Sequence, residues 1–271
     1  MFSAVIPIFN HAKFLEDAVW SAIRCPLVSE ILLLDDGSSD NSPDLAASLA
    51  ERHKGLVRDL TPEARENHGA HNRLNQLVAA AQSEWIAVLN SDDLFFADRF
   101  EAIVEEVAFR DCDFAFGNIA IINGSGHIVD TRRGPFHTGV AFPPSFDVDE
   151  MTGRGAFLDL LSHQNYLSTT SNMVFRKTLH THVGGFSGFR YVHDWDFGLR
   201  AMAIGRTAYI PHFLTAYRIH PTNTIRQSPD AVLLESKSMF EHLIEEFPNL
   251  QSRPAFAMGA QFNLSLRQLN S

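Results

Sequence analysis

Short runs of aliphatic and β-branched residues alternate with segments of helical periodicity through the first 120 residues. The strand-like runs span 4–9, 31–34, 56–60 and 85–89. The segments between them repeat apolar residues at the spacing of amphipathic helices. Strands that alternate with helices form mostly parallel sheets with helices on both faces. We therefore predict an α/β chain with a Rossmann-like, mostly parallel sheet.

The alternation stops after residue 122, where turn-forming residues begin. Asn123-Gly124-Ser125-Gly126 predicts a hairpin turn between strands at 114–122 and 127–131, and a loop follows over 134–145. The later elements are predicted as strands at 171–176, 208–210 and 214–219 and a helix at 194–204. We therefore expect a smaller mixed region after the parallel sheet.

Ser-Pro-Asp occurs at 42–44 and again at 228–230, and each copy predicts the start of a helix. A serine hydroxyl can cap the first turn, proline suits the first helical position, and the helix dipole favours an acid there. An apolar stripe follows the second copy, so we expect a C-terminal helical extension over 226–271.

Charge and cysteine content limit the classes of function. The chain has 22 basic and 32 acidic residues, a net charge of −10. This balance argues against nucleic-acid binding, which needs a basic surface for the phosphates. Two cysteines without C-x-x-C spacing favour a reducing, cytoplasmic location, and no apolar run has the length of a membrane span. A peripheral contact at the inner face of a membrane stays an open alternative.

Two acidic pairs, Asp35-Asp36 and Asp92-Asp93, directly follow the second and fourth predicted strands. Parallel sheets bind ligands beyond the carboxyl ends of their strands, where these pairs fall. Turn formation alone explains one such pair, but adjacent carboxylates repel each other, so two pairs favour a bound cation or polar ligand. The sequence has neither G-x-G-x-x-G after the first strand nor a P-loop, so a bound diphosphate would need a divalent metal, Mn²⁺ or Mg²⁺.

Seven segments in order make the chain resemble the family 2 glycosyltransferases, which have a GT-A fold. They are Ala4 to Asn10, Asp35 to Asp40, Asn67 to Gly69, Leu89 to Asp93, Val183 to Phe186, His193 to Arg200 and Tyr217 to Thr224. One such segment is a weak signal, whereas seven in the family's order are specific. The resemblance implies a glycosyltransferase domain over 1–225, with a nucleotide-binding half at 1–122 and an acceptor-side half at 123–225.

The resemblance also implies a role for each motif. Contacts to the nucleotide would come from Pro7, Phe9, Asn10, Asp35, Asp36, Asn67, Gly69 and Asp92. Of the second acidic pair, one acid would meet the ribose and the other the metal, and His220 would be a further ligand beside Asp92 and Asp93. Asp194 would be the general base that deprotonates the acceptor hydroxyl. Contacts to the donor or acceptor sugar would come from Gly185, Phe186, His193 and Trp195.

These residues also have plain structural interpretations. Asp194 could be a first-turn helix acid, His220 is one of 13 histidines, and Trp195 could be a core residue. Two positions depart from the family pattern. Asn90 stands where many members have an acid, which removes a charge from the cation site, and His193 replaces the usual Glu or Gln.

The combined features predict a metal-dependent, inverting glycosyltransferase with a UDP-sugar as donor. The acceptor would be a carbohydrate or glycolipid in glycan or polysaccharide biosynthesis, selected by residues 124–170 and the C-terminal helices. Two alternatives stay open. A metal-dependent nucleotidyl or phosphoryl transferase would leave Asp194 and 217–224 without a role, and a non-catalytic sugar-nucleotide-binding module is favoured by Asn90 and His193.

Overall fold

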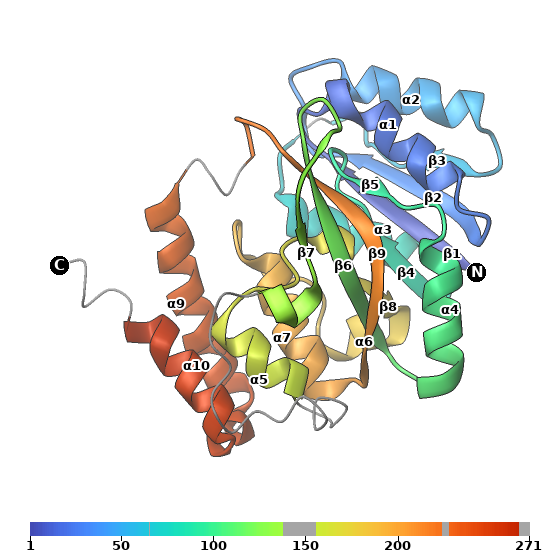
Figure 1. The fold of residues 1–271 in the computed structure, drawn as a ribbon. Coiled ribbons are helices and arrows are strands. Elements are labelled where there is room, and N and C mark those ends of the chain that lie inside the picture. Colours follow the sequence, from blue (N-terminus) through green and yellow to red (C-terminus); the bar gives the residue numbers. More distant parts are fainter. Residues whose placement is uncertain (65, 138–155, 224–227, 266–271) are drawn as a thin grey trace.

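A computed structural model of the 271-residue chain describes residues 1–64, 66–137, 156–223 and 228–265. These residues form one nine-stranded sheet with helices on both faces (Figure 1). The strand order is β3-β2-β1-β4-β8-β6-β9-β5, and β7 pairs with β6 outside this path. None of the described helices is both long and apolar enough to cross a bilayer.

The first half of the sheet is parallel. Its strands are β1 (Phe2–Ile8), β2 (Val28–Asp35), β3 (Val57–Asp59) and β4 (Trp85–Val88), and the connecting helices are α1 (Ala12–Ile23), α2 (Ser42–Arg52) and α3 (Ala70–Ala80). In register, Ala4 of β1 lies between Ile31 of β2 and Ala87 of β4. The predicted alternation of strands and helices is confirmed. The loops that follow β1, β2 and β4 therefore leave the sheet at the same edge.

The second half of the sheet is mixed. Its strands are β5 (Leu94–Phe95), β6 (Phe114–Asn123), β7 (Ile128–Arg132), β8 (Val174–Arg176) and β9 (Thr207–Ile219). The predicted β6–β7 hairpin is confirmed. The two strands predicted at 208–210 and 214–219 are one strand, β9, which runs parallel to β6 with a shift of register near Asn118.

Three smaller differences from the predictions follow β7. The segment predicted as a strand at 171–176 begins in a 3₁₀ turn (Thr170–Asn172), and only Val174–Arg176 pairs in the sheet. Gly134–His137 forms a 3₁₀ turn at the start of the predicted loop. The rest of that loop, 138–145, lies outside the described residues.

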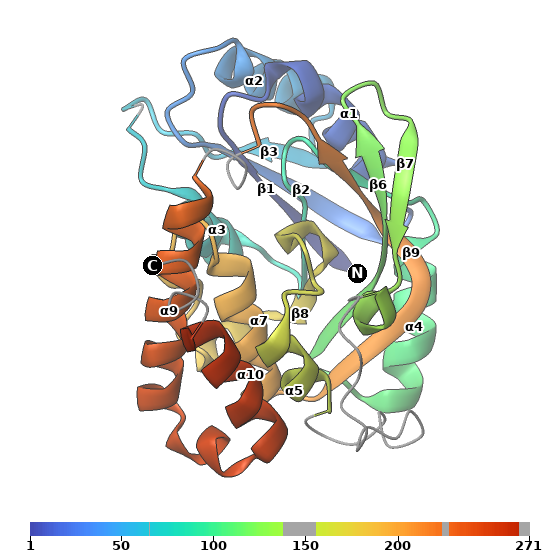
Figure 2. The same cartoon turned by 60° about the vertical axis from the view of Figure 1, so that its left-hand side comes forward.

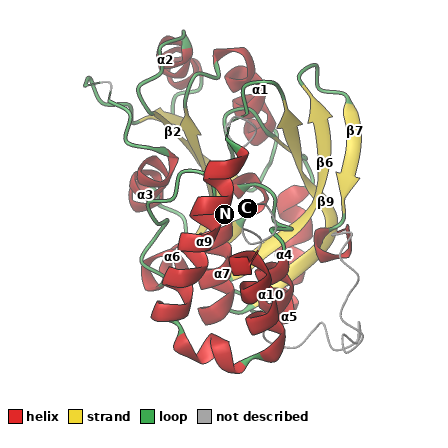
Figure 3. Cartoon of the chain, turned by 90° about the vertical axis from the view of Figure 1, so that its left-hand side faces the viewer, coloured by secondary structure: helices red, strands yellow, loops and turns green. Residues whose placement is uncertain are grey.

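The remaining helices cover the two faces of the sheet. They are α4 (Arg99–Arg110), α5 (Ala156–His163), α6 (Lys177–His182), α7 (His193–Ile204), α9 (Pro229–Glu246) and α10 (Pro254–Ser265). The helix predicted after Ser228 is present as α9. Figures 2 and 3 show α9 and α10 packed as a pair beside α5 and α7.

Apolar side chains on successive strand residues divide the core into two clusters. Val5 faces a cluster that includes side chains of α3, α5, α7, α9 and α10. Ala4 and Ile6 face the other cluster, with side chains of α1, α2 and α4. Because both faces of β1 are covered, the strand is a continuous apolar run, as is usual for parallel sheets.

The start of α2 corrects one local expectation. Asn41 occupies the N-cap position without a side-chain cap, and Ser42 is the first helical residue. The Ser42 hydroxyl accepts a hydrogen bond from the backbone N–H of His11 at 3.1 Å. Ser42 therefore links the loop after β1 to α2 instead of capping the helix.

Candidate functional site

The loops after β1 and β2 are tied to each other at the carboxyl edge of the sheet. Asn10 donates its backbone N–H to the Ser38 hydroxyl at 2.8 Å, and its side-chain oxygen accepts from the Ser39 N–H at 2.8 Å. Asn10 has a φ of 54°, a left-handed conformation that asparagine tolerates better than most residues. Asp35 accepts the Ser38 N–H at 2.8 Å. Asn10 and Asp35 are predicted to bind the nucleotide, and their hydrogen bonds also fix the shape of the loops after β1 and β2.

Asp36 holds the predicted 67–69 segment against the end of β2. Its carboxylate accepts from the backbone N–H groups of His68 and Gly69 at 2.7 and 3.0 Å and from Arg73 Nε at 2.9 Å. The Asn67 amide donates to the Asp36 carbonyl at 3.1 Å. Asp36 and Arg73 are both buried. The structure therefore brings Asp36, Asn67 and Gly69 together, as the resemblance implies.

Phe9 presents an exposed aromatic ring directly after β1. Its exposed fraction is 45%, whereas Pro7 lies inside the strand opposite Leu34. An exposed ring at the carboxyl edge of a parallel sheet is a surface on which a planar base can stack.

Asp92, His220 and His11 form a compact polar cluster. One carboxylate oxygen and one nitrogen of each imidazole lie within 4.8 Å of one another. His220 Nε2 is 2.9 Å from Asp92 Oδ2, and His11 Nδ1 is 3.8 Å from Asp92 Oδ1. One carboxylate and two imidazoles are a donor set that fits a divalent cation. Asp92 and His220 were predicted, whereas His11 was missed, although its position after β1 places it at the same edge of the sheet.

Asp93, predicted as a further metal ligand, lies outside the group formed by Asp92, His220 and His11. The carboxyl group is fully buried and accepts from Ser171 Oγ at 2.6 Å, Thr169 Oγ1 at 3.1 Å and the Arg218 backbone N–H at 2.8 Å. Burial, together with the charge of Asp92, raises the pKa of Asp93 to about 8. Asp93 anchors the turn that carries Asp92.

Arg218 and Phe14 support the cluster through contacts with Asp92 and His220, and neither was predicted as a site residue although Arg218 stands in the 217–224 motif. Arg218 Nε donates to the Asp92 carbonyl at 2.7 Å, and its guanidinium lies 4.8 Å from the centre of the Phe14 ring. The Phe14 ring in turn lies 5.0 Å from the imidazole of His220. The turn at Asp92 and the end of β9 are therefore held in a fixed relation.

Asp194 is the second residue of α7 and is 9% exposed. Asn165 Nδ2 donates to Asp194 Oδ2 at 3.0 Å. Asn165 belongs to the same short segment, 165–171, whose Thr169 and Ser171 hydroxyls donate to Asp93. One segment thus connects the predicted base to the acidic pair.

Tyr217 gives a second, electrostatic link between these carboxylates. Burial raises the pKa of Tyr217 well above its usual value, and the charges of Asp93, Asp92 and Asp194 raise it further. Tyr217 lies two residues before the end of β9, on the strand that leads to His220. The geometric link between Asp194 and the acidic pair is the 165–171 segment.

Two imidazoles, one on α3 and one on α7, each have a buried ring nitrogen. Among the residues described, these Nδ1 atoms of His71 and His193 have no hydrogen-bond partner. Burial lowers the pKa of His71, as does the charge of His193, while Asp36 and Glu235 act in the opposite direction.

Two of the predicted sugar contacts have rings that pack in the core. Phe186 is buried and stacks on Phe197 with ring centres 4.2 Å apart, and Trp195 is buried with its indole N–H donated to the Leu161 carbonyl at 2.7 Å. Both rings therefore serve the packing of α7. Gly185 has a φ of 80°, and its carbonyl accepts from the Arg200 guanidinium at 2.8 Å, so it forms a turn beside α7.

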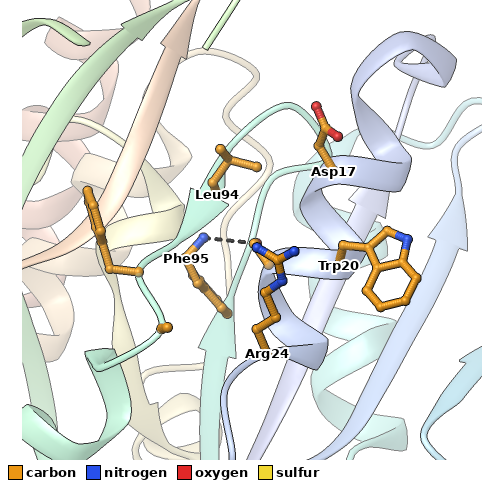
Figure 4. Close-up of a pocket in the computed structure, with 8 residues that line it drawn as sticks. Asp17, Trp20, Arg24, Leu94 and Phe95 are labelled. Carbon is orange, nitrogen blue, oxygen red and sulfur yellow. Dashed lines mark hydrogen bonds between the residues drawn. The ribbon is translucent and has the colours of Figure 1, made fainter. Parts of the chain in front are cut away.

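A cavity of about 520 Å³ lies elsewhere, between α1 and the 94–97 segment (Figure 4). It is lined by Asp17, Trp20, Ser21, Arg24, Leu94, Phe95, Phe96 and Ala97. The Phe95 N–H donates to the Ser21 hydroxyl at 3.0 Å across its floor. None of the predicted site residues lines it, so the polar cluster and not this cavity carries the candidate chemistry.

Sequence comparisons find relatives named as glycan-building proteins. Glycosyltransferase GlyG of Streptococcus pneumoniae is 31% identical over 119 residues, 44% of this chain and 38% of that protein. The succinoglycan biosynthesis protein ExoU of Rhizobium meliloti is 31% identical over 121 residues, 45% and 34% of the two chains. The putative teichuronic acid biosynthesis glycosyltransferase TuaG of Bacillus subtilis is 29% identical over 129 residues, 47% and 50% of the two chains. The matches thus span at most half the length of these relatives.

Solved structures confirm the expected GT-A fold. The S. aureus TarS fragment 1–349 in complex with UDP-GlcNAc matches with a TM-score of 0.65 at 15% identity, over 90% of this chain and 66% of that one. The mannosyltransferase PcManGT of Pyrobaculum calidifontis, in complex with GDP-Man and Mn²⁺, matches with a TM-score of 0.59 at 15% identity, over 98% and 69%. The family model described as "Glycosyl transferase family 2" matches residues 3–198, which include every motif up to the start of α7. This chain belongs to glycosyl transferase family 2.

Proposed function

We propose that this protein is a metal-dependent, inverting glycosyltransferase that moves a sugar from a UDP-sugar to a carbohydrate or glycolipid acceptor. The observation that carries the proposal is the contact of Asp92 with His220, together with the 165–171 segment, which hydrogen-bonds to Asp194 at one end and to Asp93 at the other. The names of ExoU and TuaG support a place in glycan or polysaccharide biosynthesis, and the UDP-GlcNAc complex of TarS supports a uridine donor.

Asp92 and His220 would hold the divalent cation, Mn²⁺ or Mg²⁺, beside the donor diphosphate. When bound, the cation supplies positive charge for the departing diphosphate. His220 Nδ1 lies 2.8 Å from the Thr222 hydroxyl, which leaves Nε2 on the Asp92 side, where a ligand atom is needed. The Mn²⁺ in the complex of PcManGT, which has a similar fold, supports the use of a divalent cation.

Asp194 would accept the proton of the acceptor hydroxyl as that hydroxyl attacks the sugar. Asn165 donates to one carboxylate oxygen and so fixes the orientation of the group. A carboxylate suffices for this role when it is within hydrogen-bond reach of the reacting hydroxyl, because geometry precedes basicity in general-base catalysis. A single displacement of this kind inverts the configuration at the sugar carbon.

The nucleoside would stack on the exposed ring of Phe9, beside Pro7. Asn10, Asp35, Asp36, Asn67 and Gly69 would form the rest of this half of the site, partly through the loops that they shape. His193 would contact the donor or acceptor sugar next to the base. Phe186 and Trp195 would act only by packing α7 in place.

The test is the Asp194→Asn variant, with UDP affinity and sugar transfer measured separately. We expect transfer to fall by at least about 100-fold, a typical loss for a general base, while UDP affinity stays within about twofold. Asp17→Asn, which changes an exposed acid on α1, is the matched control and should keep full transfer.

Three outcomes would contradict the proposal. Full transfer by the Asp194→Asn variant would reject the assigned base. Turnover of UTP or another nucleotide without a sugar would favour a nucleotidyl or phosphoryl transferase. Binding of UDP-sugars by the wild-type protein, with no transfer to any glycan acceptor in a panel, would favour a binding module.

A further inference from the structure

His11 is the member of the polar cluster to which no motif gives a role. It lies in the loop after β1, and its ring meets the ring of His220 edge to face, with centres 5.6 Å apart and an angle of 88° between planes. The question is whether this imidazole is a third metal ligand or only a neighbour of Asp92.

The backbone on both sides of His11 is anchored. The His11 N–H donates to Ser42 Oγ at 3.1 Å, and the next N–H, that of Ala12, donates to Asp40 Oδ2 at 3.0 Å. The ring itself has Nδ1 2.9 Å from the Ser91 hydroxyl, a contact that an ion bound at Nδ1 would replace. The anchored backbone holds the imidazole beside Asp92, and positioning of this kind favours a ligating residue.

The distances leave room for an ion between the three side chains. The separation of 3.8 Å between His11 Nδ1 and Asp92 Oδ1 is too long for a hydrogen bond. Adjacent ligands of one ion lie about 3.0–3.4 Å apart when each bond to the ion is about 2.1 Å, so His11 would move slightly toward Asp92 on binding. His220 Nε2 and Asp92 Oδ2, 2.9 Å apart, form a hydrogen bond that the ion would replace.

We propose that His11 completes a site of two imidazoles and one carboxylate, which selects Mn²⁺, Fe²⁺, Co²⁺ or Zn²⁺ over Mg²⁺ and Ca²⁺. The inference rests on the proposed function, because Asp92 and His220 are the other two ligands. Imidazole suits transition-metal ions, whereas Mg²⁺ and Ca²⁺ take oxygen ligands. His11 is thus the residue that determines which cation the protein takes.

The test is a titration of the metal-free protein with Co²⁺, followed by the visible absorption of the bound ion. We expect His11→Ala to raise the Co²⁺ dissociation constant by on the order of 10–100-fold and to change the spectrum, since one nitrogen ligand is lost. The dissociation constant for Mg²⁺, from displacement of Mn²⁺ measured by EPR, should change by no more than about twofold. His212→Ala, which removes an exposed histidine on β9, is the matched control and should bind Co²⁺ as the wild type does.

His11→Gln separates coordination from hydrogen bonding, because glutamine can still bond to Ser91 but has no imidazole. It should lose Co²⁺ affinity like His11→Ala, and circular dichroism checks that both variants are folded. Wild-type Co²⁺ affinity in both variants, with loss in Asp92→Asn, would overturn the role of His11 and leave the proposed function intact. Wild-type affinity in Asp92→Asn as well would instead reject the proposed cation site.

Discussion

Asp92 and Asp93 are adjacent in the chain, yet their carboxyl groups have different environments. Asp92 faces two imidazoles, while Asp93 is surrounded by hydroxyls and a backbone N–H. Burial and the charge of Asp92 raise the pKa of Asp93, while the hydrogen bonds from Ser171, Thr169 and the Arg218 N–H act in the opposite direction. One acid of the pair thus faces the cation side, and the other anchors the turn.

Asn165 should matter for the rate of transfer and not for donor binding. Its amide makes the hydrogen bond that orients Asp194, and a hydrogen bond to a charged group contributes about 1.5 kcal/mol, which corresponds to roughly tenfold in rate. We therefore expect Asn165→Ala to lower kcat about tenfold and to leave the KM for the donor unchanged. Steady-state kinetics measure both constants, and Asn249→Ala, at an exposed position, is the control. A rise in KM with unchanged kcat would show that Asn165 serves the donor instead.

At the scale of elements, α9 and α10 are tied to the part of the chain that carries Asp194. Glu235 of α9 accepts the backbone N–H groups of Arg190 and Tyr191 at 2.9 and 2.6 Å, directly before α7. Arg253, which precedes α10, forms a bidentate ion pair with Asp159 of α5. The C-terminal helices therefore help to fix the position of α7.

Gly259 allows α10 to approach α5 closely. A Cβ at this position would lie 2.2 Å from Ser162 Oγ and 2.8 Å from the Ser162 backbone carbon. The backbone contact cannot be relieved by a rotamer change, so Gly259→Ala must move α10 away from α5. We expect a loss of about 1–3 kcal/mol of unfolding free energy despite the better helix propensity of alanine.

Urea denaturation measures this loss, and hydrogen exchange should show weaker protection in α5 and α10. Gly124→Ala is the matched control, since a Cβ there has no atom within 4 Å, and it should change stability by less than about 0.5 kcal/mol. Equal stability of Gly259→Ala and the wild type would contradict the close packing of the two helices.

The elements differ in how far the sequence predicts them, and the reason is physical. Strands β1, β2 and β4 are buried on both faces along most of their length, so their apolar runs are visible in the sequence. Elements such as β5, two residues long, and the mostly apolar α10 lack such a pattern. The site shows the same division, because Asp92, His220 and Asp194 stand in motifs, whereas His11 and Asn165 acquire their roles from contacts with distant segments.

At the scale of the whole molecule, the sheet joins the two predicted halves. Strand β4 pairs with β8, and β5 pairs with β9, so strands from 1–122 and 123–225 alternate in one sheet. Arg99, fully buried, adds a further connection, since its guanidinium donates to the Ser171 carbonyl and to Thr215 Oγ1. Opening the site between the halves would therefore break the sheet, and we expect ligands to enter through the loops at its edge.

His180 should make the stability of the whole molecule depend on pH. Burial lowers the pKa of its imidazole to about 4, and the charges of Arg200 and Lys177 add to the effect. The ring stacks on Phe175 and bonds to Asn75 Oδ1 at 2.9 Å. An unfolded histidine has a pKa near 6.5, so between pH 6.5 and 4 the unfolded state binds more protons than the folded state. The stability from this residue is present above pH 6.5 and is lost as the pH falls, by up to about 3 kcal/mol.

Urea denaturation at pH 7.5 and pH 5 tests this effect. His180→Phe keeps an aromatic ring against Phe175 but cannot titrate, so it should lose less stability than the wild type over this interval, by roughly 2 kcal/mol. His242→Ala removes an exposed histidine of α9 and should retain the wild-type dependence on pH. The other titrating groups are the same in His180→Phe and the wild type, so any difference between them comes from His180. An equal loss of unfolding free energy in the two proteins would contradict the prediction. It would mean that the folded protein accommodates a charged His180, for which the contact of α6 with β8 and α3 would have to open in acid.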